Sequence, residues 1–121
     1  LGGAGLISTL NDYETFCRML LNKGELNGKR ILSEKAAEII MTNQYPEEMK
    51  TNAQMGHGLS GMVNLETGEY NWGGAAATSF WINPTDNLIV ICYTQLFSSP
   101  TSYASEFKTT VDQALLDRTG E

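Results

Sequence analysis

The segment from Glu69 to Pro84 holds the residues whose types and spacing best suit chemistry. It contains both tryptophans of the chain, the glycine pair Gly73-Gly74 and a run of three alanines at 75–77. A glycine in a strand often marks a place where a ligand approaches the backbone, because no side chain stands in the way. Small residues here would leave backbone N–H groups accessible. We interpret the segment as a strand edge facing a cleft; a tight hairpin whose small residues pack under a helix is the alternative.

Two other groups of residues could support acid–base chemistry. Glu47 and Glu48 form a carboxylate pair, but adjacent residues point apart, which favours a solvated loop. His57 lies between glycines and could act as a general base. No nucleophile or orienting acid lies near it in the sequence, so a structural role at the start of a strand is favoured. With one histidine and no Cys-x-x-Cys pair, we expect neither a zinc site nor another cofactor.

Hydrophobic periodicity and capping residues predict two helices ahead of this segment. Apolar residues recur at helical spacing over 10–22, with Ser8 and Thr9 as candidate N-caps and Gly24 just past the end. Ser33 should cap a second helix over 34–43. Between the two helices the pair Asn27-Gly28 predicts a turn in a short hairpin-like excursion.

The hydrophobic period changes to two at Gly56, which predicts an antiparallel meander of about four strands. The predicted strands cover 56–65, 70–74, 78–82 and 88–94. The last of them is almost wholly apolar, so we expect it to be central and covered on both faces. A final helix over 102–118 should cover the sheet. The fold class is therefore α+β in one domain over 1–121, with a helical segment at 1–55 and the strands and C-terminal helix at 56–121.

Composition narrows the possible partners. The chain has 121 residues and a formal net charge of −6, which argues against nucleic acid and anionic membranes as partners. No apolar run reaches membrane-spanning length and no targeting segment is recognisable, which leaves the compartment open and slightly favours the cytoplasm. Cys17 and Cys92 lie in apolar surroundings far apart in the sequence, which favours buried thiols over a disulfide.

Several short motifs occur in a characteristic order. The chain opens with Gly2-Gly3-Ala4-Gly5-Leu6-Ile7-Ser8-Thr9, and later carries Gly56-His57-Gly58-Leu59, Tyr70-Asn71-Trp72-Gly73-Gly74-Ala75 and Phe80-Trp81-Ile82-Asn83-Pro84. Together with Asp12-Tyr13 and the segment 19–33, this order resembles the β-lactamase-like serine hydrolases, which include class C β-lactamases, DD-peptidases and related carboxylesterases. The resemblance covers nearly the whole chain and implies part of a β-lactamase/transpeptidase-like fold.

This resemblance implies a mechanism and a set of site residues. In the family a serine attacks an ester or lactam carbonyl, a lysine and a tyrosine handle protons, and two backbone N–H groups hold the oxyanion. By resemblance, one of these N–H groups belongs to Ala75, and Trp72, Gly73 and Gly74 line the substrate site. Trp72 takes the position of the lysine of the β-lactamase Lys-Thr-Gly motif. Because an indole carries no charge, a neutral ester suits the site better than the carboxylate of a penicillin.

The family's nucleophile motif is missing from the chain. Its Ser-x-x-Lys and Tyr-x-Asn motifs lie upstream of the matched region, and neither is present here in that order. Ser105-Glu106-Phe107-Lys108 has the right spacing, but it follows the third motif instead of preceding it. We therefore interpret it as part of an amphipathic helix. Since the chain also starts at Leu1 instead of Met, we expect a C-terminal fragment that is inactive alone.

Three functional hypotheses follow. The leading one is the C-terminal part of a β-lactamase-related serine hydrolase that favours esters, with a small-molecule ester or lactam as substrate of the complete enzyme. β-Lactamase or DD-peptidase activity of the parent protein is the alternative in the same class, and a non-catalytic binding module is the alternative in another class. The missing N-terminal segment would be the first partner, and without it an exposed sheet edge should favour self-association.

Overall fold

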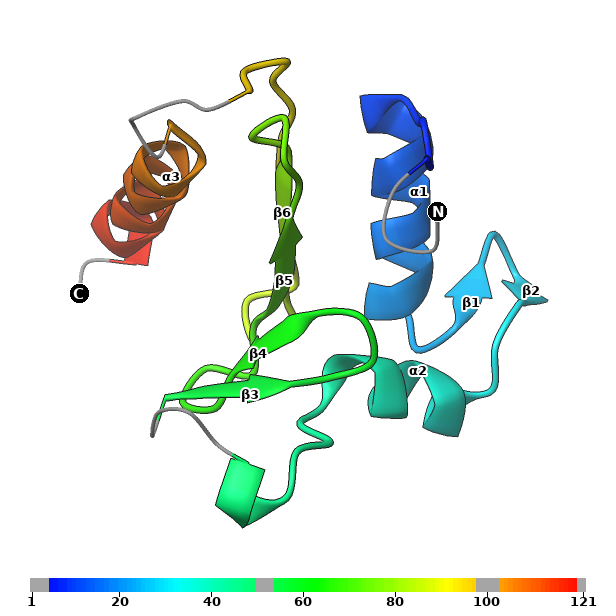
Figure 1. The fold of residues 1–121 in the computed structure, drawn as a ribbon. Helices are drawn as coiled ribbons and strands as arrows, with labels where there is room; N and C mark the ends of the chain where they lie inside the picture. The colour runs from blue at the N-terminus through cyan, green and yellow to red at the C-terminus, as the bar shows by residue number, and fades with distance from the viewer. Residues whose placement is uncertain (1–4, 50–53, 98–102, 120–121) are drawn as a thin grey trace.

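The computed structural model describes residues 5–49, 54–97 and 103–119. Its main body is a five-stranded antiparallel sheet with helices on both faces (Figure 1). The elements in chain order are α1 (Leu10–Leu21), β1 (Glu25–Leu26), β2 (Lys29–Arg30), α2 (Glu34–Met41), the short 3₁₀ helix η1 (Glu47–Met49), β3 (Met55–His57), β4 (Met62–Asn64), β5 (Tyr70–Gly73), β6 (Ser79–Asn83), β7 (Leu88–Cys92) and α3 (Tyr103–Thr119). The α+β class predicted from the sequence is confirmed.

Helix α1 is fixed at both ends by the residues that predicted it. The Thr9 side chain accepts a hydrogen bond from the Asp12 N–H at 3.2 Å, which satisfies a free donor of the first turn. At the other end Gly24 has a φ of 87°, and its N–H donates to the Met19 carbonyl at 2.8 Å. A glycine in this left-handed conformation is a common helix ending. The predicted helix is confirmed and ends at Leu21.

The β1–β2 hairpin and helix α2 carry the chain from α1 to the sheet. Asn27 and Gly28 have φ angles of 50° and 75°, which suits the two-residue turns that join twisted strands. The Ser33 side chain accepts a backbone hydrogen bond at 3.1 Å and caps α2. The helix ends at Met41, two residues earlier than predicted, because the backbone of Thr42 is already extended.

The core lies between α1 and the face of the sheet turned toward it (Figure 1). The strand order is β3-β4-β5-β6-β7, and opposite residues in an antiparallel pair share a face. Tyr70 of β5 stands opposite Val63 of β4 and Ile82 of β6, and all three are buried. The buried cluster consists of Cys17, Met19 and Leu20 from α1 and Val63, Tyr70, Phe80 and Ile82 from the sheet.

Both cysteines are free thiols, and the prediction that they are buried is confirmed for Cys17 alone. Cys17 is fully buried in the core, and this burial raises the pKa of its thiol to about 12. Because the thiolate is the reactive form, Cys17 should be inert at neutral pH. Cys92 is half-buried at the end of β7.

The single strand predicted over 56–65 is wrong, because the chain turns back on itself there and makes two strands. The Gly58 N–H donates to the Gly61 carbonyl at 2.8 Å, and Ser60 has a φ of 64°. The Tyr70 ring occupies the space that a Cβ on Gly61 would need. The Tyr70 hydroxyl also donates to the Leu59 carbonyl at 2.8 Å, which draws this peptide away from a strand geometry. The sheet therefore has five strands instead of about four.

The expectation that the strand at 88–94 is central is also wrong. Within the described residues β7 pairs with β6 alone and forms an edge of the sheet. The expectation of covered faces is confirmed, since α1 contacts β7 from one side and α3 from the other (Figure 1). An almost wholly apolar strand sequence indicates that both faces of the strand are buried. It does not indicate whether another strand pairs with each of its edges.

Helix α3 lies on the face of the sheet opposite α1 (Figure 1). It begins at Tyr103, close to the predicted start. Ala104 is buried, whereas Tyr103 and Phe107 remain about half exposed. The helix thus covers the sheet, as predicted, with Ala104 buried and these two aromatic side chains still partly in solvent. None of the helices in the described ranges is both long and apolar enough to cross a membrane.

Replacing Gly61 by alanine should lower the free energy of unfolding by about 1–3 kcal/mol, because the added methyl group would overlap the Tyr70 ring. Gly73→Ala is the matched control. A Cβ at that position would meet its nearest neighbour, the Ser79 hydroxyl, at 3.4 Å. Its stability should therefore stay within about 0.5 kcal/mol of wild type or rise slightly. Urea denaturation of both variants measures the difference, and equal midpoints would show that the turn relaxes without cost.

Candidate active-site wall

The glycine–alanine segment forms the tip of the β5–β6 hairpin. Beyond Gly73 the Gly74 N–H donates to the Thr78 carbonyl at 2.7 Å, and the Ala77 N–H donates to the Gly74 carbonyl at 3.1 Å. The chain therefore reverses in a tight hairpin, as one of the two interpretations predicted. The small residues are not packed under a helix, however, because Gly73, Gly74 and Ala75 are all exposed.

One backbone donor at this tip is open. Within the described residues, nothing accepts a hydrogen bond from the Ala75 N–H. Only glycine fits at the preceding position, since a Cβ on Gly74 would collide with the Thr78 hydroxyl, and both Gly74 and Ala75 are exposed. A preorganised backbone N–H next to open space is the kind of group that stabilises a developing oxyanion.

The residues that follow β7 lie close to the tip at the top of Figure 1 and are hydrogen-bonded to it. The Thr94 hydroxyl lies 2.8 Å from the Ala76 carbonyl oxygen and 3.0 Å from that of Ala77. The Leu96 N–H also donates to the Ala76 carbonyl, at 3.1 Å. Ala77 has a φ of 57°, which costs a residue with a side chain about 1–2 kcal/mol. The bonds to its two flanking carbonyls offset this strain.

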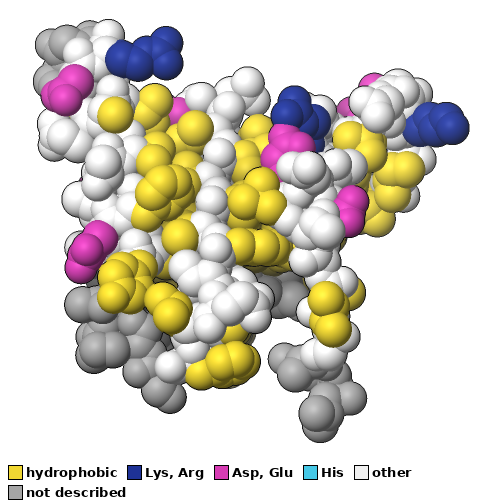
Figure 2. Space-filling model, turned by 90° about the horizontal axis from the view of Figure 1, so that it is seen from above, with side chains coloured by type: hydrophobic (Ala, Val, Ile, Leu, Met, Phe, Trp, Pro, Cys, Tyr) yellow, Lys and Arg dark blue, Asp and Glu magenta, His cyan; other side chains and the backbone are white. Residues whose placement is uncertain are grey.

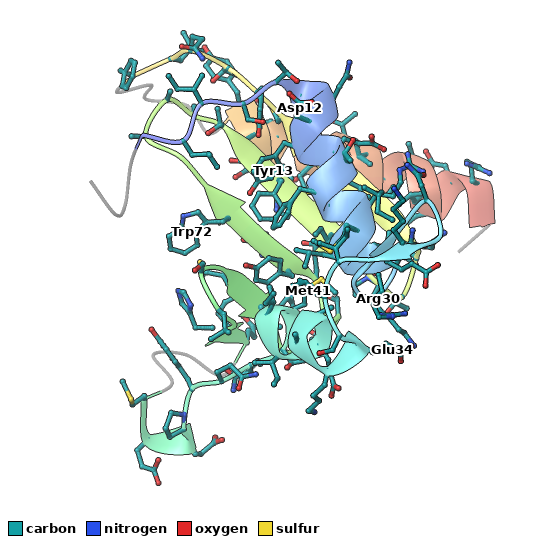
Figure 3. All side chains as sticks on the ribbon, turned by 90° about the vertical axis from the view of Figure 1, so that its right-hand side faces the viewer. Asp12, Tyr13, Arg30, Glu34, Met41 and Trp72 are labelled. Carbon is teal, nitrogen blue, oxygen red and sulfur yellow. The ribbon has the colours of Figure 1, made fainter. Side chains whose placement is uncertain are left out.

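Trp72 stands next to the tip and belongs to a group of three aromatic rings. The indole meets the His57 ring edge-on, with centroids 5.5 Å apart. The Tyr45 ring stacks on His57 at 5.1 Å with an interplanar angle of 20°. Trp72 remains 46% exposed, and Figure 3 shows it apart from Tyr13 and Met41, outside the packed space between α1 and α2. The indole therefore offers an accessible apolar surface on the same hairpin, three residues before the open Ala75 N–H.

Asn43 holds this aromatic group in place. Its side-chain oxygen accepts hydrogen bonds from the Tyr45 N–H at 3.1 Å and from the His57 N–H at 3.0 Å. Its side-chain nitrogen donates to the Tyr45 carbonyl at 3.2 Å. His57 ends β3 instead of starting a strand, and its ring nitrogen Nδ1 lies 3.2 Å from the Gly58 carbonyl oxygen. These contacts agree with the structural role predicted for His57. Sequence reasoning missed Asn43 and Tyr45, which lie in a polar loop without a motif.

The lysine of the Ser105-x-x-Lys108 sequence is engaged elsewhere. The Lys108 ammonium lies 2.8 Å from a Glu69 carboxylate oxygen and 2.6 Å from one of Asp112, and Lys108 is only 12% exposed. Burial lowers the pKa of Lys108, but the hydrogen bonds to Asp112 and Glu69 outweigh burial and raise it overall. A lysine held as an ammonium in two ion pairs is a poor general base for Ser105. Its visible role is to attach α3 to the β4–β5 turn.

The remaining candidates lie away from this tip or serve the core. Glu47 and Glu48 form part of η1 and are exposed, as predicted for a solvated segment. The Tyr70 phenol is packed in the core, and burial raises its pKa. Burial also raises the pKa of Tyr13 and of Tyr93, whose rings lie 5.9 Å apart. These phenols stay protonated at neutral pH and do not provide a base.

A hollow formed by the described residues lies elsewhere. It has a volume of about 290 Å³ and is lined by Leu6, Ser8, Asp12, Tyr13 and Phe16 at the start of α1. None of the predicted site residues lines it; Trp72, Gly73, Gly74 and Ala75 are instead exposed at the surface. Figure 2 looks onto the end of the molecule where α1 begins and shows hydrophobic side chains at several places across this face. No group of three His, Cys, Asp or Glu residues in the described ranges could hold a metal ion.

Comparisons with known proteins agree with this arrangement. The family model described as "Beta-lactamase" matches residues 2–115, almost the whole chain. Two Mycobacterium tuberculosis proteins, "Protein Rv1367c" and "Uncharacterized protein MT1414", are each 29% identical over 109 residues, covering 74% of this chain and 27% of the relative. The chain thus spans about a quarter of the length of these relatives.

Solved structures share the fold. A protein assigned as a 6-aminohexanoate-dimer hydrolase from Bacillus anthracis aligns with a TM-score of 0.76 and 21% identity, over 97% of this chain and 31% of its own. Simvastatin synthase from Aspergillus terreus aligns with a TM-score of 0.60 and 17% identity, over 73% of this chain and 29% of its own. At these identities the likeness shows the fold alone.

Replacing Lys108 by methionine should lower the free energy of unfolding by roughly 3 kcal/mol, the lower end of the cost of breaking a buried pair. Glu69, only 13% exposed, would then lack its cation. Lys35→Met is the matched control, since Lys35 pairs with Glu38 at the surface with 71% of its side chain exposed. It should cost less than about 1 kcal/mol. Urea denaturation measures both, and equal costs would contradict the anchoring role of Lys108.

The pH dependence gives a further check on the same variant. Because the folded-state pKa of Lys108 is raised, its contribution to stability is complete below the ordinary lysine value and is lost as the pH rises through the folded pKa. On the alkaline side, the difference in unfolding free energy between wild type and Lys108→Met should therefore persist above neutral pH and disappear only in strong alkali.

Proposed function

Because this chain belongs to the beta-lactamase family, we propose that it forms one wall of the active site of a serine hydrolase that cleaves esters. The observation that carries the proposal is the open Ala75 N–H at an exposed hairpin tip of small residues, which follows the exposed Trp72 on the same hairpin. In this proposal the Ala75 N–H is one of the two donors that bind the oxyanion, and Trp72, Gly73 and Gly74 form the surface along which the substrate lies.

The chemistry assigned to this wall is acyl transfer. The oxygen of a serine hydroxyl attacks the ester carbonyl carbon and its proton passes to a neighbouring base. The carbonyl oxygen becomes an oxyanion, which accepts hydrogen bonds from the Ala75 N–H and from the N–H of the serine itself. Collapse of the intermediate breaks the ester C–O bond, and the leaving alkoxide takes up the proton. Water then hydrolyses the acyl-enzyme by the same sequence.

We place the nucleophile outside residues 1–121. The only Ser-x-x-Lys sequence lies in α3, and its lysine is committed to Glu69 and Asp112. The chain spans about a third or less of the proteins that it matches. The proposal is therefore that the chain is the C-terminal part of a longer hydrolase, which supplies the serine and the groups that move its proton.

We propose a neutral ester as the substrate class because of Trp72. The indole is uncharged and 46% exposed; it meets the His57 ring edge-on, and Tyr45 stacks on His57. A carboxylate beside this surface would lose part of its hydration without gaining a cationic partner.

A fluorophosphonate, which reacts with activated serines, tests the reaction class. The full-length protein that carries this chain should form one adduct, and peptide mapping should place it on a serine outside residues 1–121. A Ser105→Ala variant is the control and should label as wild type does. An adduct on Ser105, or no adduct on the full-length protein, would contradict the proposal.

Replacing Trp72 by lysine tests the substrate class. The new ammonium should raise the ratio of kcat/KM for a carboxylate-bearing β-lactam over that for a neutral p-nitrophenyl ester by about tenfold, the value of one charged hydrogen bond. Trp72→Met is the uncharged control and should leave the ratio near its wild-type value. If Trp72→Lys and Trp72→Met give the same ratio, Trp72 does not face the substrate's charged group.

A further inference from the structure

We infer that Thr94 is a positioning residue for the Ala75 N–H: its hydroxyl holds the hairpin tip in the conformation that directs this donor toward the substrate. The inference rests on the proposed function for its catalytic consequence. No local sequence pattern singles out Thr94, which lies just after the end of β7.

The Thr94 hydroxyl hydrogen-bonds to the tip on both sides of Ala77, the residue in the left-handed conformation. Its single hydroxyl hydrogen is shared between the Ala76 carbonyl at 2.8 Å and the Ala77 carbonyl at 3.0 Å. These carbonyls belong to the two peptide groups on either side of the Ala77 α-carbon. A donor to both therefore restrains the two torsion angles of Ala77, the residue with a φ of 57°.

The conformation of Ala77 matters for Ala75 because the turn is short. The Ala77 N–H donates to the Gly74 carbonyl at 3.1 Å, which closes a four-residue turn around Ala75. An alanine prefers to leave the left-handed region. If Ala77 relaxes, the peptide groups within the turn rotate with it, and the direction of the Ala75 N–H changes.

Loss of the hydroxyl should disturb this turn without unfolding the sheet. The Leu96 N–H would still donate to the Ala76 carbonyl at 3.1 Å, and the Gly74 N–H would still donate to the Thr78 carbonyl at 2.7 Å. The two ends of the turn thus stay attached while its centre loses a restraint. Since Thr94 contacts carbonyl oxygens of the tip and not the open N–H, it acts through the loop.

The test compares Thr94→Val with Thr94→Ser in the full-length protein. Valine keeps the shape and removes the hydroxyl, whereas serine keeps the hydroxyl. Thr94→Val should lower kcat for the neutral ester by about 10- to 100-fold, less than the loss from removing an oxyanion donor outright. KM should change by less than about twofold, because the oxyanion forms only in the transition state. Thr94→Ser should recover most of kcat.

Thr85→Val is the matched control. Thr85 lies in the turn between β6 and β7, and its hydroxyl also donates to a backbone carbonyl, that of Thr67, at 3.3 Å. Thr85→Val should leave kcat unchanged. NMR of protein labelled with ¹⁵N-alanine gives a second readout. The amide signal of Ala75 should shift in Thr94→Val and return in Thr94→Ser, with Thr85→Val as the unshifted reference.

The outcomes separate this inference from the proposed function. Wild-type kcat in Thr94→Val, or an unmoved Ala75 signal, would overturn the inference while leaving the hydrolase proposal intact. A loss of kcat that serine does not recover would also overturn it, since it would then arise from packing and not from the hydroxyl. Failure of the wild-type protein to react with a fluorophosphonate would sink the proposed function and the catalytic part of the inference together.

Discussion

The pairing of β5 with β6 is the constraint on which the rest of the structure depends. The register sets Tyr70 opposite Ile82 and Trp72 opposite Phe80. Because side chains alternate along a strand, a slip by one residue would turn the buried Tyr70 and Ile82 to the other face. The same register carries Gly73 to the end of the ladder, where the chain must reverse. The hydrophobic core therefore decides where the bare hairpin tip emerges, and the chemistry assigned to the tip follows from that packing.

The helices and the tight turns could be predicted from the sequence because their determinants are local. Thr9, Gly24 and the Asn27-Gly28 pair each satisfy nearby backbone groups or adopt an unusual φ, and each does so in the structure. The split between β3 and β4 could not be predicted in this way, because the Tyr70 ring against Gly61 causes it across strands. The edge position of β7 could not be predicted either, because the hydrophobicity of a strand indicates whether its faces are covered and not which strands lie beside it.

The residues of the candidate site also fall into those that the sequence singles out and those that it does not. Trp72, Gly73, Gly74 and Ala75 stand out in the sequence because their composition is unusual. Thr94 does not, because its bonds reach back 17 and 18 residues to carbonyl groups that every residue possesses. Asn43 is a similar case, since it holds Tyr45 and His57 through backbone groups. Residues that support a site through the backbone of others leave no motif, and only the three-dimensional arrangement reveals them.

A hairpin tip made of glycine and alanine has no large side chains that could make it rigid. Its small side chains leave the Ala75 N–H accessible, but they also provide no packing that would fix the turn. One of its residues, Ala77, even adopts a conformation that alanine disfavours. The rigidity must therefore come from the neighbouring segment, where a hydroxyl and a backbone N–H donate to the carbonyls of the tip. Because an oxyanion donor is effective only when its direction is fixed before reaction, the supporting residues of such a site bear on its chemistry as directly as the residues that face the substrate.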